Sequence, residues 1–285
     1  MILVTGATGK VGSEAVRVLR QQDVPVRALV RDPAKAQYLA AAGAELAVGD
    51  FDDPLSLKQA MHGVTSVLLT SPGGEPAQEL HVVDAAAEAG VGHVVKLTSK
   101  ASPDSPIARQ RWHAEVEKGL AASGVPHTLL RSNAYMQNTM MVAPTIAKTS
   151  SFASSIGAGR VGMADARDVG AVAASVVADP TGHAGKTYWL SGPELLTYTD
   201  VTDVLTQLLG RTVTFLPRSR DEDEAEMVSA GLPQPVAAMN ALALSLFAQG
   251  DAEWLSPDME TLLKRSARTY QQFATDHLAA FSRCW

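Results

Sequence analysis

Short, almost uninterrupted apolar runs alternate with stretches of helical periodicity along the first half of the chain. Runs without a polar residue at every second position are typical of strands that are covered on both faces in a parallel sheet. The predicted strands are Ile2–Thr5, Val26–Val30, Glu45–Val48, Ser66–Thr70, His93–Thr98 and Thr128–Arg131. With right-handed crossovers between them, they predict an α/β fold with a doubly wound parallel sheet.

The helices between these strands have recognisable start signals and apolar faces. Asp32-Pro33 and Asp53-Pro54 each place a carboxylate that can cap a helix before a proline in its first turn. The first predicted helix carries an apolar stripe made of Val11, Ala15, Val18 and Leu19.

The pattern changes after the sixth predicted strand. Residues 132–159 carry one charge, on Lys148, and three methionines. A helix over Ala166–Ala178 and a strand over Lys186–Leu190 then return to the sheet, and the remaining chain is mostly helical. We therefore expect a sheet domain and a smaller, mostly helical substrate-binding part, the former made of 1–131 with 160–191 and the latter of 132–159 with 192–285.

A glycine-spaced turn joins the first predicted strand to the first helix. In its G-x-x-G-x-x-G pattern the first glycine allows a tight turn, the second lets the backbone approach a pyrophosphate, and the third lets helix and strand pack closely. The helix N-terminus offers N–H groups to phosphate oxygens. A ligand-free turn is the alternative, but the strand–turn–helix context favours a Rossmann dinucleotide-binding domain. The residues assigned to the cofactor here are Thr5, Gly6, Thr8, Gly9, Lys10, Val11 and Gly12.

The end of the second predicted strand bears on the choice between NAD and NADP. Arg31 follows the strand and Lys35 lies one helical turn beyond, and such cations favour the 2′-phosphate of NADP. A carboxylate would instead accept the ribose hydroxyls of NAD, and Asp32 is a candidate, although capping explains it as well. We expect NADPH, with NADH the less favoured cofactor.

Other strand ends complete the predicted cofactor site. Asp50 and Phe51 could contact the adenine amino group and its face, or form an acidic turn before the Asp53 cap. The end of the fourth strand is expected to pass the nicotinamide ribose, with a plain turn as the alternative, and the end of the fifth strand is also assigned to the cofactor. The residues assigned there are Thr70, Ser71, Pro72, Thr98 and Ser99.

Charge and composition narrow the function classes. A formal net charge of −6 gives no general attraction for nucleic acid. The uncharged stretch 227–250 is broken by glycine and proline and does not fit a membrane span. Met1 leads into an apolar run without a basic leader, so we expect a cytoplasmic protein. Cys284, the single cysteine, cannot form an internal disulfide. The acidic run 221–226 is expected to be a solvated helix start, and we assign no metal.

Several motifs resemble the NmrA-like branch of the atypical short-chain dehydrogenases/reductases. They are the glycine turn, Gly49-Asp50-Phe51, the His113-x-x-x-Glu117-x-x-Leu120 spacing, and Leu130-Arg131-Ser132-Asn133-Ala134-Tyr135. The resemblance covers essentially the whole chain. It implies an NADPH-dependent reductase of quinones or triphenylmethane dyes, or a redox-sensing regulator. Some members of that branch reduce a quinone in aromatic polyketide pathways, and the hydroquinone then reacts with oxygen.

The chain departs from ordinary short-chain dehydrogenases at their catalytic pair. Tyr-x-x-x-Lys, in which the tyrosine donates a proton and the lysine lowers its pKa, occurs nowhere in the sequence. Alignment on Glu117-x-x-Leu120 puts Arg109 at the tyrosine position and His113 at the lysine position. Without that acid, hydride transfer suits an acceptor that delocalises the resulting negative charge, such as a quinone or a conjugated cation.

Three polar side chains are candidates for catalysis. On a helix predicted over Pro106–Ser123, His113 could hydrogen-bond the ribose or donate toward a hydroquinone oxygen, with Glu117 orienting it. The alternative is a solvated histidine paired with Glu117. Lys100, after the fifth strand, is another possible donor or a surface cation.

The segment after the sixth strand is the predicted substrate site. The residues assigned there are Asn133, Tyr135, Met136 and Asn138. Methionines suit an adaptable apolar pocket, although they could equally be ordinary core. The uncharged stretch 232–247 could roof that pocket or bury a dimer contact. Possible protein partners are a second copy of the chain or a second component of a hydroxylation system.

These patterns predict an NADPH-dependent oxidoreductase that transfers hydride to a quinone or similar conjugated aromatic acceptor. A narrower version makes it the reductase step of an aromatic polyketide hydroxylation, a monooxygenase system of antibiotic biosynthesis. The alternative is an NADP(H)-binding redox sensor without turnover, which the missing Tyr-x-x-x-Lys pair permits. Partner binding that follows the NADP/NADPH ratio would support the sensor.

Overall fold

The computed structural model describes residues 1–71 and 75–282, so Pro72 and Cys284 lie outside the described residues. The chain divides into two compact units, and each unit is built from three stretches. The first unit comprises Met1–Ser132, Ala166–Leu190 and Asp258–Lys264, and the second comprises Asn133–Asp165, Ser191–Pro257 and Arg265–Trp285. The return to the sheet unit thus begins later than the predicted residue 160. Residues 258–264, which the prediction gave to the substrate part, belong to the sheet unit.

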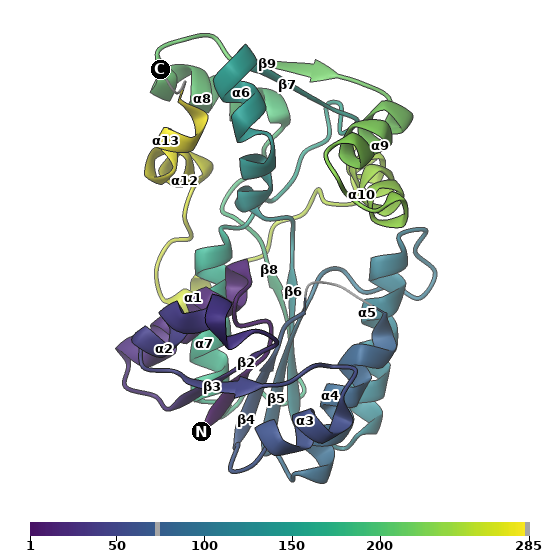
Figure 1. Ribbon diagram of the computed structural model, residues 1–285. Coiled ribbons are helices and arrows are strands. Elements are labelled where there is room, and N and C mark those ends of the chain that lie inside the picture. The colour runs from purple at the N-terminus through teal and green to yellow at the C-terminus, as the bar shows by residue number, and fades with distance from the viewer. Residues whose placement is uncertain (72–74, 283–285) are drawn as a thin grey trace. The chain divides into compact units, whose positions relative to one another are not determined.

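A seven-stranded parallel sheet forms the centre of the first unit (Figure 1). Its strand order is β3-β2-β1-β4-β5-β6-β8. The strands are β1 (Ile2–Val4), β2 (Val26–Val30), β3 (Glu45–Val48), β4 (Ser66–Leu69), β5 (His93–Thr98), β6 (His127–Ser132) and β8 (Thr187–Leu190). The order reverses between β1 and β4, and ligands bind at the carboxyl ends of strands at such a switch point. The predicted doubly wound Rossmann fold is confirmed.

Helices cover both faces of this sheet. Those packed together on one face are α3 (Pro54–Ala60), α4 (Pro76–Glu88) and α5 (Ala108–Ala122). Leu57, Val83 and Leu120 from these helices pack against Leu3 and Val67 of the strands. On the other face, α7 packs against α1 and α11; these helices are α1 (Lys10–Gln21), α7 (Ala166–Ala178) and α11 (Asp258–Leu263).

Local signals account for much of the connecting structure. Asp32 and Asp53 cap their helices as predicted, the 3-10 helix η1 (Pro33–Ala36) and α3. The short α2 (Gln37–Ala41) follows η1. The predicted stripe of α1 needs one correction, because Val16 is buried and Val18 is only half-buried. The buried arc is shifted because α7 packs along α1 in addition to the sheet.

The edge strand β8 is covered by a late segment of the chain. The backbone N–H of Trp189 in β8 donates to Asp258 Oδ2 at the start of α11, with an N–O distance of 2.8 Å. An uncovered strand edge exposes unpaired backbone groups that can pair with another chain. Residues 258–264 therefore complete the sheet unit at this edge.

The second unit has its own core and is mostly helical. Buried side chains of Met136, Phe152, Tyr270, Phe273 and Phe281 lie at its centre. Its helices are η2 (Met136–Met141), α6 (Ala143–Thr149), α8 (Tyr198–Leu209), α9 (Arg220–Ser229), α10 (Gln234–Phe247), α12 (Tyr270–Asp276) and α13 (Leu278–Phe281). A parallel pair of strands that the sequence pattern did not predict, β7 (Ser151–Ser154) and β9 (Thr214–Pro217), completes it. Within residues 1–71 and 75–282, no helix has the length and hydropathy to cross a membrane.

Candidate active site

At two positions of the glycine turn between β1 and α1, no residue larger than glycine fits. Gly6 adopts a φ of +53°, and a Cβ there would lie 2.4 Å from Thr70 Oγ1. A Cβ on Gly12 would lie 2.3 Å from the carbonyl oxygen of Gly6. Each distance is far below a van der Waals contact, so the tight turn and the close approach of α1 depend on these glycines.

The N-terminus of α1 is suited to an anion. Gly9 is the N-cap residue, and no side chain caps the helix. Helix geometry leaves the first N–H groups without an intrahelical acceptor, and the helix dipole adds a positive potential there. A Cβ on Gly9 would lie 3.1 Å from the Gly6 carbonyl oxygen, inside the turn. The turn and the uncapped helix end therefore fit a pyrophosphate.

Thr5 and Thr70 join the carboxyl ends of β1 and β4. Thr5 Oγ1 donates to the Thr70 carbonyl oxygen at 2.7 Å and accepts from the Thr70 N–H at 2.9 Å. Thr70 Oγ1 in turn donates to the Thr5 carbonyl oxygen at 3.0 Å. Both side chains are buried. Their hydroxyls hold the turn in place, and a contact of Thr5 and Thr70 with the cofactor stays a prediction. Thr8, Gly9 and Lys10 are the exposed positions of the predicted motif.

The end of β2 presents exposed positive charge. Arg31 is exposed directly after the strand, and among the described residues no carboxylate pairs with it. Asp32 Oδ1 accepts from the Ala34 N–H at 3.0 Å, so the capping alternative for Asp32 is confirmed. Lys35 Nζ lies 3.7 Å from Asp32 Oδ2, in an exposed pair. The arrangement leaves Arg31 as the stronger candidate for a 2′-phosphate.

Asp50 and Phe51 follow β3 in a tight turn. Asp50 Oδ1 accepts from the Asp52 N–H at 3.0 Å. Phe51 is half-buried, packs against the core beneath the sheet, and its carbonyl oxygen lies 2.8 Å from His81 Nδ1. The contacts correspond to the alternative of an acidic turn before the Asp53 cap, and a contact with adenine stays a prediction.

A fully buried ion pair lies below the ends of β4 and β5. Lys96 Nζ, in β5, donates to Glu79 Oε1, in α4, at 2.7 Å, and the two side chains are 0% and 5% exposed. The same oxygen accepts from the hydroxyl of Ser71, just after β4. Burial lowers the pKa of Lys96, and the charge of Glu79 opposes that change. Sequence reasoning assigned Ser71 but overlooked Lys96 and Glu79.

The side chain of Glu117 is held by β5 and β6. It accepts from Arg131 Nε at 3.1 Å, from Arg131 Nη2 at 2.5 Å and from Thr98 Oγ1 at 3.3 Å. Arg131 also lies over the ring of Trp189, 5.0 Å from its centroid. The arginine engages the carboxylate through two nitrogen atoms, and the role of Glu117 in orienting His113 stays a prediction. The hydroxyl of Thr98, assigned to the cofactor, is likewise directed to Glu117.

His113 lies in α5 among cations. It is half-buried, and burial together with the charges of Lys96, Arg109 and Arg131 lowers its pKa to about 3. The half-buried position does not correspond to the alternative of a solvated histidine. Near neutral pH the imidazole is uncharged, so one ring nitrogen can donate and the other can accept.

This low pKa predicts how stability varies with pH. A histidine that is harder to protonate in the folded state favours unfolding once the unfolded form gains its proton. We expect wild type to lose stability relative to His113→Gln as the pH falls from 6.5 toward 3, by about 1–2 kcal/mol at pH 4 after allowance for partial exposure. Urea unfolding across this pH range measures the difference. His62→Gln, at an exposed histidine, is the control, and a parallel trend in both variants would contradict the prediction.

Ser99 and Lys100 follow β5 at the same end of the sheet. Both are half-buried, and the hydroxyl of Ser99 lies 3.5 Å from the Lys100 carbonyl oxygen. Their assignment to the cofactor and to proton donation stays a prediction.

Two of the four predicted substrate residues hold the fold of the second unit. Asn133 Nδ2 donates to the carbonyl oxygens of Ala252 and Trp254, at 3.0 and 3.3 Å. Met136 is fully buried in the core of that unit. Met136 therefore corresponds to the alternative that the methionines are ordinary core residues. Asn133 links its own segment to the backbone of residues 252–254 by hydrogen bonds. Tyr135 is half-buried and Asn138 is exposed, so the predicted substrate contact is left to these two.

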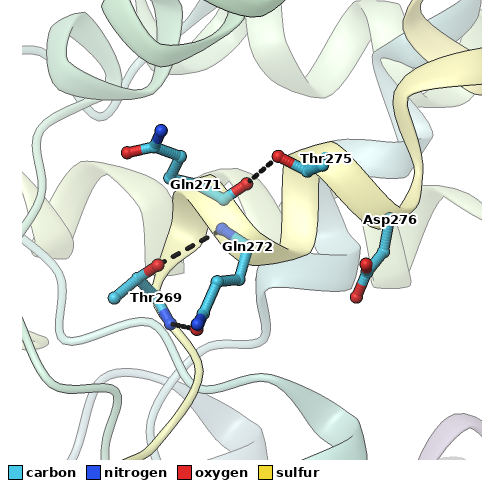
Figure 2. A pocket seen from close by; sticks show the side chains of 5 residues that line it. All are labelled: Thr269, Gln271, Gln272, Thr275 and Asp276. Atoms are coloured by element: carbon cyan, nitrogen blue, oxygen red, sulfur yellow. Dashed lines mark hydrogen bonds between the residues drawn. The ribbon is translucent and has the colours of Figure 1, made fainter.

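A shallow hollow of about 400 Å³ lies along α12 (Figure 2). Its lining residues are Thr269, Gln271, Gln272, Thr275 and Asp276. The Thr269 side chain accepts from the Gln272 N–H, and Thr275 Oγ1 donates to the Gln271 carbonyl oxygen (Figure 2). These hydrogen bonds lie within α12 and its N-terminal cap, and none of the lining residues is a predicted substrate residue.

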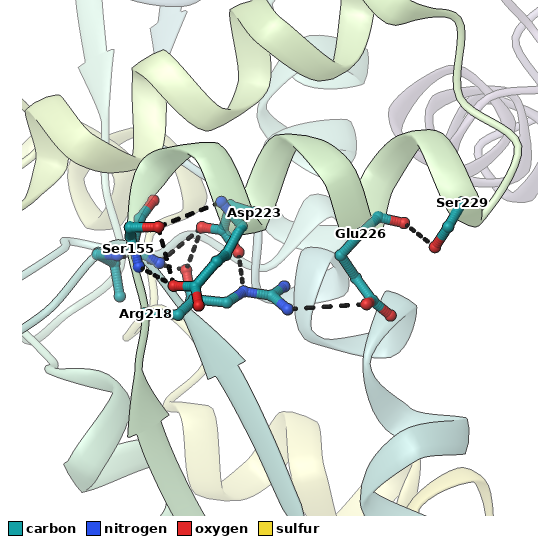
Figure 3. A network of polar contacts seen from close by, with 9 residues as sticks. Ser155, Arg218, Asp223, Glu226 and Ser229 are labelled. Carbon is teal, nitrogen blue, oxygen red and sulfur yellow. Dashed lines mark hydrogen bonds and ion pairs between the residues drawn. The ribbon is translucent and has the colours of Figure 1, made fainter.

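The acidic start of α9 is only partly solvated. Asp223 is 1% exposed and accepts from Arg218 Nε at 2.5 Å and from the Ser155 N–H at 2.6 Å (Figure 3). The prediction of a solvated helix start is therefore wrong for Asp223, because Arg218 and Ser155, just after β7, supply donors to its buried carboxylate. In the described part of the chain, no three His, Cys, Asp or Glu side chains are placed to hold a metal ion.

Known proteins resemble this chain over nearly its whole length. The model of the NmrA-like family matches residues 1–268. NAD(P)H azoreductase of Xenophilus azovorans is 36% identical over 288 residues, which covers 99% of each chain. Quinone oxidoreductase 2 of Escherichia coli (strain K12) is 36% identical over 247 residues, covering 85% of this chain and 86% of that protein.

Solved structures agree with these matches. The Escherichia coli NADPH-dependent quinone oxidoreductase complexed with NADPH gives a TM-score of 0.88 at 33% identity, covering 98% of this chain and 100% of the other. The Citrobacter sp. triphenylmethane reductase complexed with NADP(H) also gives a TM-score of 0.88, at 28% identity, covering 97% of this chain and 99% of the other.

Proposed function

The chain belongs to the NmrA-like family, and from this premise we propose that it is an NADPH-dependent reductase which transfers hydride to a quinone or a similar conjugated aromatic acceptor. The observation that carries the proposal is the glycine turn, where Gly6 and Gly12 leave no room for a side chain and α1 begins uncapped. The quinone, azo and triphenylmethane reductases among its relatives support an acceptor with an extended conjugated system.

The two ends of the cofactor are assigned to different parts of the sheet. We assign its pyrophosphate to the N–H groups that start α1 and its 2′-phosphate to Arg31, because a guanidinium matches phosphate geometry. Ser71, after β4, and His113, in α5, are assigned to the nicotinamide half. When bound, NADPH supplies the hydride.

Reduction without a Tyr-x-x-x-Lys pair is part of the proposal. The acceptor delocalises the charge it gains, and the neutral imidazole of His113 can donate one hydrogen bond to the developing oxygen. The charges of Lys96, Arg109 and Arg131 lower the His113 pKa, and Lys96 and Arg131 are each held in place by a carboxylate. Donors that are already held in place can stabilise a developing anion without reorganisation during the reaction.

Turnover with a panel of acceptors tests the function. We expect the purified chain to oxidise NADPH in the presence of naphthoquinones or anthraquinones, followed by absorbance. Oxygen uptake recorded in the same reactions tests the narrower role in polyketide hydroxylation, which requires uptake that depends on both NADPH and the aromatic substrate. Cofactor binding without turnover on any quinone or dye would overturn the reductase assignment, and partner binding that follows the NADP/NADPH ratio would favour a sensor.

Arg31 provides a test of cofactor choice. We expect Arg31→Ala to weaken NADPH binding about 10- to 100-fold and NADH binding less than about threefold, because only NADPH carries the 2′-phosphate. Calorimetric titration with both cofactors measures the ratio. Arg17→Ala is the matched control, since Arg17 is an exposed arginine already paired with Glu14. Equal losses for NADPH and NADH would show that Arg31 does not read the phosphate.

A further inference from the structure

The position of Lys96 is unusual for a charged side chain. It is fully buried in the middle of β5, in register with Leu69 of β4 and Leu129 of β6. An ammonium in apolar surroundings is costly unless it is paired, and Glu79 supplies the pairing. Well-packed apolar residues could replace such a pair at little or no loss of stability. Stability alone therefore gives no account of these two residues.

The carboxylate of Glu79 makes a second contact that an apolar pair could not make. Its Oε1 atom accepts from both Lys96 Nζ and Ser71 Oγ. Ser71 is thereby fixed from α4, and its neighbour Thr70 is fixed from β1 by Thr5. Two consecutive residues just after β4 are thus held by hydrogen bonds, and the bond to the buried Glu79 involves a charge and is the stronger kind.

We infer that Lys96 and Glu79 form a positioning pair for hydride transfer, which fixes Ser71 against the nicotinamide half of the cofactor; this rests on the proposed function. The adenine half is assigned to Arg31 and the start of α1, which the pair does not touch. Loss of the pair should therefore disturb the placement of the nicotinamide more than the affinity for the whole cofactor. A small misplacement of reacting atoms is enough to slow a reaction strongly.

The test removes both charges together, because either single substitution leaves an unpaired buried charge and risks unfolding. We expect Lys96→Met/Glu79→Leu to melt within about 5 °C of wild type and to bind NADPH within about threefold, while kcat with a quinone falls at least about tenfold. The fluorescence of bound NADPH, which reports the surroundings of the nicotinamide, should change in the same variant. Ser71→Ala should reproduce both effects and add nothing when combined with the pair.

A neutral hydrogen-bond acceptor at position 79 is expected to restore the activity that Lys96→Met/Glu79→Leu loses. Lys96→Met/Glu79→Gln keeps an oxygen for the Ser71 hydroxyl and is expected to recover most of kcat and the wild-type fluorescence. Asp84→Asn, at an exposed carboxylate of the same helix, is the matched control and should leave both unchanged. A folded Lys96→Met/Glu79→Leu variant with wild-type kcat and fluorescence would overturn the inference.

The two proposals fail in different ways. If the wild-type chain turns over no acceptor, the proposed function fails, while the fluorescence of bound NADPH still compares wild type with the variants. Identical fluorescence in wild type, Lys96→Met/Glu79→Leu and Ser71→Ala would then overturn the positioning role by itself.

Discussion

Gly12→Ala is expected to weaken NADPH binding about 100-fold, because even a single methyl group has no space at this position. Its Cβ would lie 2.3 Å from the Gly6 oxygen, 2.9 Å from the Gly6 carbonyl carbon and 3.0 Å from Ala7 Cα. All three atoms belong to the backbone of the turn, so relief requires the turn to open. Calorimetric titration with NADPH, together with a melting curve, separates lost affinity from lost folding.

Gly119→Ala is the matched control for Gly12→Ala. A Cβ on Gly119 in α5 would also come within 2.3 Å of an atom, but that atom is Leu80 Cδ2, the end of a flexible side chain. Alanine also favours a helix over glycine by up to about 1 kcal/mol. We expect Gly119→Ala to bind NADPH as wild type does. Wild-type affinity in Gly12→Ala would show that the turn does not hold the cofactor.

The second large effect concerns the stability of the second unit. Asp223→Ala is expected to reduce the free energy of unfolding by about 3–5 kcal/mol, because it removes a buried carboxylate and leaves the half-buried Arg218 guanidinium and Ser155 N–H without this acceptor. The carboxylate accepts from Arg218 Nε and the Ser155 N–H (Figure 3). It also accepts from Ser154 Oγ at 3.3 Å. Urea unfolding of the full chain measures the loss.

The same arginine provides an internal control. Arg218 Nη1 also lies 3.9 Å from Glu226 Oε2, whose side chain is 63% exposed (Figure 3). An exposed ion pair at that distance contributes little to stability, so Glu226→Ala should reduce the free energy of unfolding by less than about 1 kcal/mol. If both variants lost a similar free energy of unfolding, burial would add nothing to the Asp223 contact.

The fold was largely predictable because its signals are local. Each predicted strand of the sheet ends within one residue of its observed bounds, since apolar runs and turn residues mark them directly. The caps at Asp32 and Asp53 also depend only on neighbouring residues. The paired strands β7 and β9 were not predicted, because a short two-stranded sheet leaves no long apolar run.

The partners within the candidate site were less predictable, because they come from different elements. Lys96 interrupts an apolar strand, and Glu79 shares a helical stripe with Val82, Val83 and Ala86, so the sequence contains a sign that each is buried. Which residue each one meets depends on how α4 packs on the sheet. The same holds for Glu117, whose neighbour in the helix was His113 but whose partner is Arg131 of β6.

The interleaving of the two units has a consequence for synthesis on the ribosome. Strands β1 to β6 can pair once the first 132 residues have emerged, but α11, which covers the edge at β8, comes only at Asp258. The sheet unit therefore cannot be finished before residue 264 is made, when most of the second unit has already been translated. A nascent chain or a product truncated before that point exposes a strand edge to other chains. Neither unit is a continuous segment, so neither can complete its folding before the last of its three stretches has been translated.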